Sequence, residues 1–177
     1  MTPIEIALVL LVVHGGLGAF DTFVNHEWRE HLPQRTEAAL ELALHSARSW
    51  LFGISFAGLA WLEWHGAWGW VILGILVLEY VVTIADSVVE DRIRILAPVE
   101  RTNHMLLAVN SGLYIAFVAW QVVTRWRHEP SALVPVRYPV LSWLLTACAA
   151  AVVVWAVRDA LAALKLARRA AAPPRAA

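Results

Sequence analysis

Residues 68–90 decide the fold, and they read WGWVILGILVLEYVVTIADSVVE from Trp68 to Glu90. The first half of this stretch, up to Leu78, contains no charged side chain. A helix needs ~20 mostly apolar residues to cross the hydrocarbon core of a bilayer. The stretch therefore predicts a transmembrane helix, which we place at residues 68–89.

Four further apolar stretches predict helices of the same kind, at residues 3–24, 40–62, 104–123 and 138–157. The chain has 177 residues, of which 60% are hydrophobic and 16% are charged, and its mean hydropathy is +0.62. A soluble domain of this composition would lack polar surface, whereas lipid solvates an apolar exterior. We therefore expect an all-α integral membrane bundle of five transmembrane helices. It would form one domain over residues 1–165, followed by a flexible cytoplasmic tail at 166–177.

The distribution of basic residues predicts the orientation. Lys and Arg accumulate in cytoplasmic segments of membrane proteins. With five spans, one side of the membrane would hold most of the 14 basic residues, and the other only Arg125, Arg127 and Arg137. We therefore expect the N-terminus outside and the C-terminus in the cytoplasm. Residues 1–20 contain no Lys or Arg, which favours a retained first helix over a signal peptide.

Polar side chains follow one face of the predicted helix at 68–89. Glu79, Thr83, Asp86 and Glu90 are spaced i, i+4, i+7 and i+11, which aligns them on one helical face. Other helices carry similar groups: His14, Asp21 and His26 on the first, Glu41 and His45 on the second, and Glu100 and His104 on the fourth. All of these except His14 would lie near the same membrane surface. His14 and Glu79 would lie ~10 Å deeper than the rest, at a rise of ~1.5 Å per residue.

Such groups are costly in a membrane, where one charged residue at mid-helix costs ~2.5–3.5 kcal/mol. They become tolerable when they bind a cation, and carboxylate oxygen with imidazole nitrogen suits Fe, Mn and Zn. Helical bundles also build di-metal sites from inward Glu and His. The predicted metal ligands are His14, Asp21, His26, Glu41, His45, Glu79, Asp86, Glu90, Glu100 and His104. We expect the deep residues Glu79 and His14 to act in catalysis as well.

Ion pairing is the competing explanation for the groups near the membrane surface. The pairs that the sequence brings close are Glu90, Asp91 and Glu100 with Arg92, Arg94 and Arg101, and Glu41 with Arg48. A hydrogen bond between His14 and Glu79 would similarly explain the deep pair without any catalytic role.

The sequence predicts a membrane metalloenzyme whose di-iron centre oxidises or hydroxylates a lipid or isoprenoid, with Zn or Mn as alternative metals. A proton, metal-ion or small-solute permease, or a subunit of one, would use the same polar residues. A zinc-dependent hydrolase would use the same ligands. Haem is disfavoured because carboxylates prefer harder cations.

The remaining expectations concern partners and location. The net charge of +0 gives no reason to expect a nucleic-acid partner, and the single Cys148 excludes a cysteine-based metal cluster. The partners expected are the lipid bilayer, an amphiphilic small-molecule substrate and an external electron donor, because the chain has no nucleotide or flavin motif. Oligomers are compatible with the sequence. The Ala-, Arg- and Trp-rich composition favours a bacterial plasma membrane.

Overall fold

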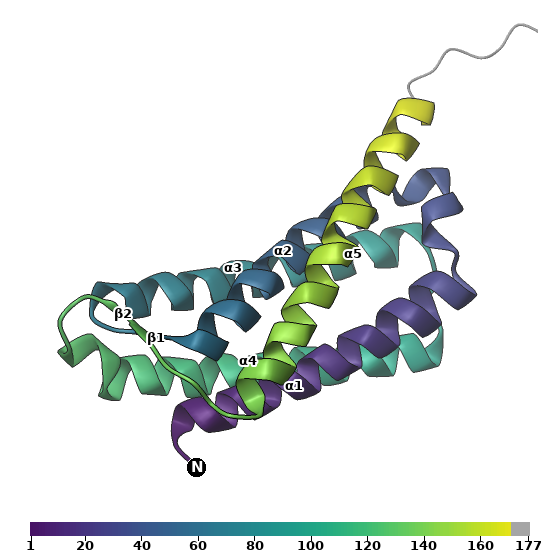
Figure 1. Ribbon diagram of the computed structural model, residues 1–177. Helices are drawn as coiled ribbons and strands as arrows, with labels where there is room; N and C mark the ends of the chain where they lie inside the picture. Colours follow the sequence, from purple (N-terminus) through teal and green to yellow (C-terminus); the bar gives the residue numbers. More distant parts are fainter. Residues whose placement is uncertain (171–177) are drawn as a thin grey trace, which may run out of the picture.

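Figure 1 shows the computed structural model of the protein, in which residues 1–170 are described. Helix makes up 84% of the structure, so the prediction of an all-helical chain is confirmed. The long helices are α1 (Pro3–Phe20), α2 (Ala39–Trp61), α3 (Ala67–Ile93), α4 (Pro98–Thr124) and α5 (Leu141–Ala170). α2 packs mainly on α5 and α3, and α1 packs mainly on α4. In Figure 1, α5 runs obliquely across the other helices.

Within residues 1–170, four helical segments are long and apolar enough to cross a membrane: Pro3–Arg29, Ala67–Ile93, Pro98–His128 and Leu141–Ala170. This supports a multi-pass membrane protein. α2 has 23 residues, but its first half carries Glu41, His45 and Arg48. Because of those polar side chains, α2 is not apolar enough to count among the four segments. The predicted fifth span at 40–62 and the predicted orientation therefore stay predictions.

Several helices extend further than the sequence indicated. The fifth was predicted at 138–157, but α5 begins at Leu141 and continues to Ala170. It therefore includes residues 166–170 of the predicted tail, and the rest of that tail, residues 171–177, lies outside the described residues. The fourth was predicted from His104, whereas α4 begins at Pro98, whose fixed φ suits the first helical turn.

Local sequence explains two of the helix starts. α1 opens with a capping box, in which the Thr2 hydroxyl accepts from the Glu5 N–H and the Glu5 carboxylate accepts from the Thr2 N–H. Before α3, Gly66 has a φ of +57°, which glycine adopts without strain. A Cβ at Gly66 would also collide with Ser131.

A short antiparallel ribbon, which the sequence did not indicate, connects the two loops at one end of the bundle. β1 (Leu62–Trp64) pairs with β2 (Leu133–Pro135), with Glu63 opposite Val134. Strands of three residues are too short to give a periodic signal. The Trp64 side chain turns inward, is 6% exposed and packs against Gly58. The ribbon therefore covers one end of the hydrophobic core.

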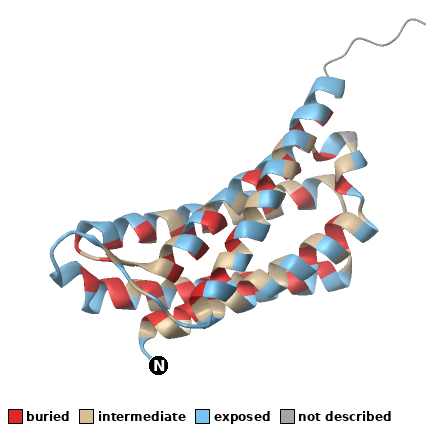
Figure 2. Cartoon of the chain, viewed as in Figure 1, coloured by how far each residue is buried: buried red, intermediate tan, exposed pale blue. Residues whose placement is uncertain are grey.

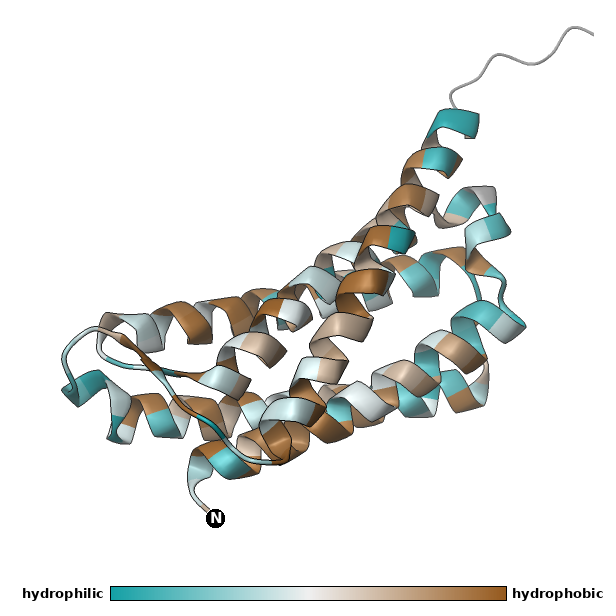
Figure 3. Cartoon of the chain, viewed as in Figure 1, coloured by the Kyte–Doolittle hydropathy of each residue, from teal (hydrophilic) through white to brown (hydrophobic). Residues whose placement is uncertain are grey.

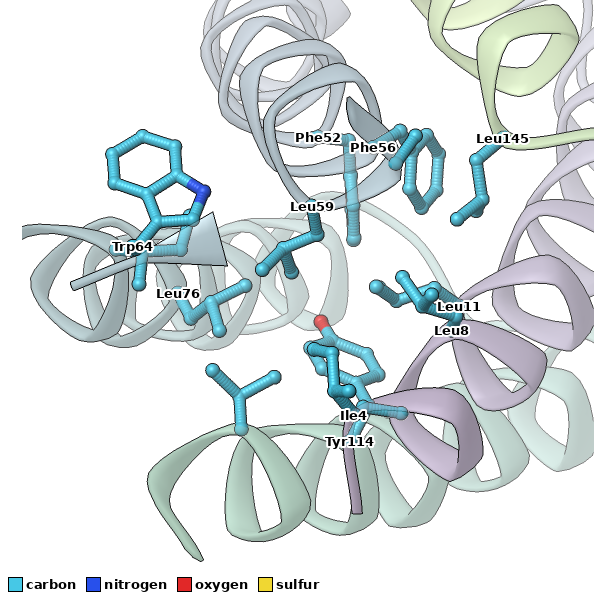
Figure 4. Packing of buried hydrophobic residues seen from close by; sticks show 14 of the residues in the cluster. Ile4, Leu8, Leu11, Phe52, Phe56, Leu59, Trp64, Leu76, Tyr114 and Leu145 are labelled. Carbon is cyan, nitrogen blue, oxygen red and sulfur yellow. The ribbon is translucent and has the colours of Figure 1, made fainter. Parts of the chain in front are cut away.

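The hydrophobic core occupies the half of the bundle nearer the ribbon, and Figure 4 shows side chains of several helices converging in it. Its members include Ile4, Leu8, Leu11, Phe52, Phe56, Leu59, Leu76, Tyr114 and Leu145. Hydrophobic residues also lie at exposed positions on the outside, as the burial colours of Figure 2 and the hydropathy colours of Figure 3 together show. Val109 and Val154 are 65% and 62% exposed, for example. An apolar exterior around an apolar core is suited to lipid rather than to water.

Candidate metal centre

Buried carboxylates and histidines gather in the half of the bundle away from the ribbon. They come from four elements: the π-helix η1 (Asp21–Arg29), which continues α1, and the helices α2, α3 and α4. Eight of the residues predicted from the sequence meet here: Asp21, His26, Glu41, His45, Asp86, Glu90, Glu100 and His104. These side chains were predicted to lie at one depth from the directions of their helices, and in the structure they lie together.

The π-helix explains how η1 contributes both Asp21 and His26. In a regular α-helix, residues five apart point ~140° away from each other. A π-helix instead forms i to i+5 hydrogen bonds, such as the one from the Glu30 N–H to the Asn25 carbonyl oxygen at 2.9 Å. His26 Nε2 consequently lies 3.4 Å from Asp21 Oδ2. The Asn25 amide also donates to Asp21 Oδ1 at 2.7 Å, which orients the carboxylate.

A first group of potential metal ligands consists of Asp21, His26, Glu100 and His104. One nitrogen or oxygen atom from each lies within 4.8 Å of those of the others. His104 Nε2 is 3.0 Å from Asp21 Oδ2, and His26 Nε2 is 3.7 Å from Glu100 Oε1. Two imidazoles with two carboxylates make a complete set of four donors for a divalent ion.

A second group consists of His26, His45 and Glu90, and it shares His26 with the first. Glu90 Oε1 is 3.7 Å from His45 Nε2 and 3.8 Å from His26 Nε2. The other oxygen, Glu90 Oε2, is 3.4 Å from His104 Nδ1 in the first group. Glu90 therefore contacts both groups of potential ligands.

Several atoms of the cluster are buried without a hydrogen-bond partner among the described residues. They include His26 Nε2, His45 Nε2, Glu41 Oε2 and both carboxylate oxygens of Asp86. His45 Nε2 lies 3.0 Å from Asp86 Oδ2 without hydrogen-bond geometry. Two ligands that are each ~2.1 Å from one ion, at right angles, are themselves ~3 Å apart. Buried ligand atoms at this spacing, without hydrogen bonds to satisfy them, are suited to a metal ion.

Arg94 confirms part of the ion-pair explanation. Its guanidinium binds both oxygens of Glu100, at 2.6 and 2.8 Å, and lies 3.3 Å from Glu41 and from Glu90. Burial lowers the pKa of Arg94, but the hydrogen bonds to Glu100 and the neighbouring carboxylates outweigh burial and raise it. Arg94 therefore stays charged. By contrast, Arg92 and Arg101 are exposed.

The predicted pairing of Glu41 with Arg48 is wrong. Arg48 Nη1 instead lies 3.0 Å from Asp86 Oδ2 on α3, and Glu41 pairs with Arg94. The reason is that residues seven apart on one helix are two turns away from each other. The side chain of the facing helix is nearer.

The charge balance leaves room for a cation. Five buried carboxylates (Asp21, Glu41, Asp86, Glu90 and Glu100) face two guanidinium groups (Arg48 and Arg94), which leaves three negative charges. The rings of His26 and His45 stack with centroids 4.5 Å apart. Two charges at that distance repel by roughly 4 kcal/mol at an effective dielectric constant of ~20. That repulsion opposes charging both rings at once, so the stacked pair adds at most one positive charge to the cluster.

The two deep residues lie outside both ligand groups. Among the described residues, Glu79 accepts hydrogen bonds from Tyr114 at 2.7 Å and from Thr83 at 2.8 Å. His14 Nδ1 lies 3.3 Å from the amide nitrogen of Asn110, and the ring of Tyr114 packs edge-on against His14. Tyr114 thus separates the two residues, which do not form the hydrogen bond considered from the sequence.

The sequence interpretation missed Asn110 and Tyr114. Both lie on α4, where Asn103, Asn110 and Tyr114 follow the same i, i+7, i+11 spacing that marks the polar face of α3. Asn103 and Asn110 donate to carbonyl oxygens of α1, at 3.2 and 3.0 Å. These bonds fix α4 against α1 and so hold His104 opposite Asp21.

Two cavities adjoin the centre. The smaller, of about 20 Å³, has room for about one water molecule and is lined by His26, His45 and Asp159 among others. The larger, of about 370 Å³, is lined mainly by α1, η1, α2 and α5, with one residue each from α3 and α4, and its lining includes Asp21, His14 and Arg48. Asp21 therefore belongs both to the first ligand group and to the wall of a large cavity.

Fold and site together define a multi-pass, all-helical membrane protein with a buried carboxylate and histidine cluster that can bind metal. Comparisons with known proteins place it no further, because no family model, no curated protein and no solved structure matches the chain.

Proposed function

We propose that this protein is an integral membrane metalloenzyme with a di-iron centre that oxidises or hydroxylates a lipid or isoprenoid. The observation that carries the proposal is the pair of ligand groups that share His26 and both contact Glu90. His26 Nε2 would ligate only one of the two ions. If that ion is in the second group, the first retains Asp21, Glu100 and His104. Two ions held in this way match the carboxylate-bridged sites of helical bundles.

The ligand chemistry does not distinguish between metals, and iron is favoured by the location of the cavity. Carboxylates and imidazoles bind Fe, Mn and Zn alike. An apolar cavity beside the centre favours chemistry on a C–H bond over hydrolysis of a water-soluble substrate. Hydroxylation of a C–H bond by O₂ takes up two electrons and two protons and yields an alcohol and water. An external donor would supply the electrons.

We further propose five spans, with the N-terminus outside and the metal centre near the cytoplasmic surface of a bacterial plasma membrane. The Lys and Arg distribution supports this orientation. α2 would be the fifth span, since its polar first half is buried among the other helices: Glu41 and His45 are 0% and 3% exposed. Such a helix need not be apolar to lie within the membrane.

The permease alternative receives less support. A transported ion would have to pass the hydrophobic core, where Leu8, Leu11, Leu59, Leu76 and Val118 are all buried. Among the described residues, none of the cluster's carboxylates or histidines belongs to this core. A site that is polar on one side only is suited to an enzyme rather than to a channel.

Elemental analysis of the detergent-purified protein, with an absorption spectrum of the same sample, tests the proposal. About two Fe per chain without a Soret band is the expected result. Stoichiometric Zn would redirect the proposal to hydrolysis, and a Soret band would replace it with haem. Failure to bind metal even after reconstitution with Fe or Zn would overturn the metalloenzyme proposal.

A further inference from the structure

The large cavity changes in character along its length. Along α2 its lining runs from Arg48 to Phe56, ~12 Å at ~1.5 Å per residue. The end level with Arg48 is polar, and its lining residues there are Asp21, Thr22, Arg48 and Ser49. The rest is mostly apolar, with Phe52, Phe56, Ala147, Ala151 and Val152. A volume of about 370 Å³ lies within the usual ~300–1,000 Å³ of ligand pockets.

Arg48 is the cation of the polar end, and its hydrogen-bonding capacity is only partly used. Its one ion pair among the described residues joins Nη1 to Asp86 at 3.0 Å, and its side chain is 20% exposed. A guanidinium has five N–H donors, and a single carboxylate oxygen takes few of them. Arg48 also lines the cavity. It is thus fixed by Asp86 and still able to bind a second anion there.

The charge of the surroundings decides which anion fits. A phosphate monoester would bring about two negative charges next to Asp21 and Asp86, with only Arg48 to balance them. A carboxylate brings one, and its planar geometry matches the guanidinium fork. The apolar remainder of the cavity is suited to a hydrocarbon chain.

We infer that the cavity binds a long-chain fatty acid, with its carboxylate on Arg48 and its acyl chain along Phe52 and Phe56. This inference names the substrate class of the proposed enzyme and rests on that proposal for its chemistry. Binding itself requires no turnover and is measured separately.

Two glycines of α1 provide a matched pair of variants. Gly18 lines the cavity, and a Cβ built there meets no atom within 4 Å. Gly16 is exposed on the outside of the helix, does not line the cavity and has equally open space around a Cβ. Gly18→Leu should therefore fill the cavity, while Gly16→Leu makes the same change of residue facing lipid.

The test is binding of radiolabelled palmitate to the full chain in detergent, competed by hexadecanol and by hexadecyl phosphate. Wild-type protein and Gly16→Leu should bind palmitate saturably. Gly18→Leu should weaken binding at least about tenfold by occlusion, and Arg48→Gln to a similar extent by loss of the charged hydrogen bond. Arg48→Lys should retain more affinity than Arg48→Gln. Hexadecanol should compete at least about tenfold less well than unlabelled palmitate.

Unchanged palmitate affinity in folded Gly18→Leu would overturn the inference, as would equal competition by hexadecanol. Stronger competition by hexadecyl phosphate would overturn the carboxylate assignment. The metal content and melting temperature of each variant show whether a failure concerns fatty-acid binding or the proposed metalloenzyme function. Two Fe per chain without palmitate binding would refute the fatty acid alone, whereas palmitate binding without metal would refute the metalloenzyme alone.

Discussion

The imidazole rings of His26 and His45 are stacked, with 4.5 Å between their centroids and 4° between their planes. Stacking brings both Nε2 atoms to nearly equal distances from one oxygen of Glu90, 3.8 and 3.7 Å. Because His26 also belongs to the group around Asp21, the stack joins the two ligand groups into one centre.

The first prediction concerns the metal content of a variant of His26, the histidine that both ligand groups share. His26→Ala should lower bound metal from about two ions per chain to one or fewer, because it removes a ligand that both groups include. The measurement is metal per chain by mass spectrometry after gel filtration. His128→Ala, in an exposed turn, is the control and should retain the wild-type content. Wild-type metal content in a folded His26→Ala protein would show that the ligand groups are wrongly assigned.

Arg94 makes a prediction about stability. Arg94→Gln leaves the carboxylates of Glu41, Glu90 and Glu100 without their shared cation, and breaking a buried ion pair costs about 3–5 kcal/mol. The free energy of unfolding in mixed micelles should fall by that order. Adding Glu100→Gln should recover part of the loss, because the two residues are directly coupled. Strictly additive effects would contradict this coupling.

A variant of the deep residue Glu79 tests the proposed catalysis separately from metal binding. Glu79→Gln should abolish turnover and leave metal content unchanged, because Glu79 lies outside both ligand groups. The amide would also place a donor near the hydroxyl of Tyr114 or Thr83, at a cost of about 1–3 kcal/mol. Activity and metal content are measured on the same preparation, with Glu63→Gln on the ribbon as control. Full activity in Glu79→Gln would remove this residue from the mechanism.

A close helix contact makes a packing prediction. A Cβ at Gly15 would lie 2.8 Å from Cys148 Sγ, so Gly15→Ala should destabilise the protein by about 1–3 kcal/mol. Gly16→Ala, with open space around its Cβ, should not. The melting temperature in detergent measures both, and Cys148→Ala should rescue Gly15→Ala. A missing rescue would mean that the contact between α1 and α5 is looser than described.

Much of the candidate site could be predicted from the sequence, because the direction of each predicted helix gives the depth of its residues in the membrane. The alternation of helix starts and ends places Glu41, Glu90 and Glu100 at one level, and they meet there around Arg94. The partners in each ion pair could not be predicted from the sequence, because they depend on how each helix is rotated about its axis relative to its neighbours. Arg48 therefore pairs with Asp86 of α3 rather than within its own helix.

Other features leave no signal in the periodicity. A π-helix changes the rotation per residue, and the sequence from Asp21 to Arg29 contains no pattern that predicts this change. The ribbon has strands of only three residues. The large cavity depends on several helices that are distant in the sequence, and on the absence of side chains at Gly15 and Gly18.

The polar-to-apolar direction of this cavity follows the helix axes, so a bound lipid would lie as its neighbours in the leaflet do. Its headgroup would remain level with Arg48 and its chain would stay parallel to the helices, without inversion across the bilayer. Such a ligand never has to leave the membrane for water. Apparent affinity would then be set by its mole fraction among the surrounding lipids, and diluting the membrane with inert lipid would weaken binding even at constant bulk concentration.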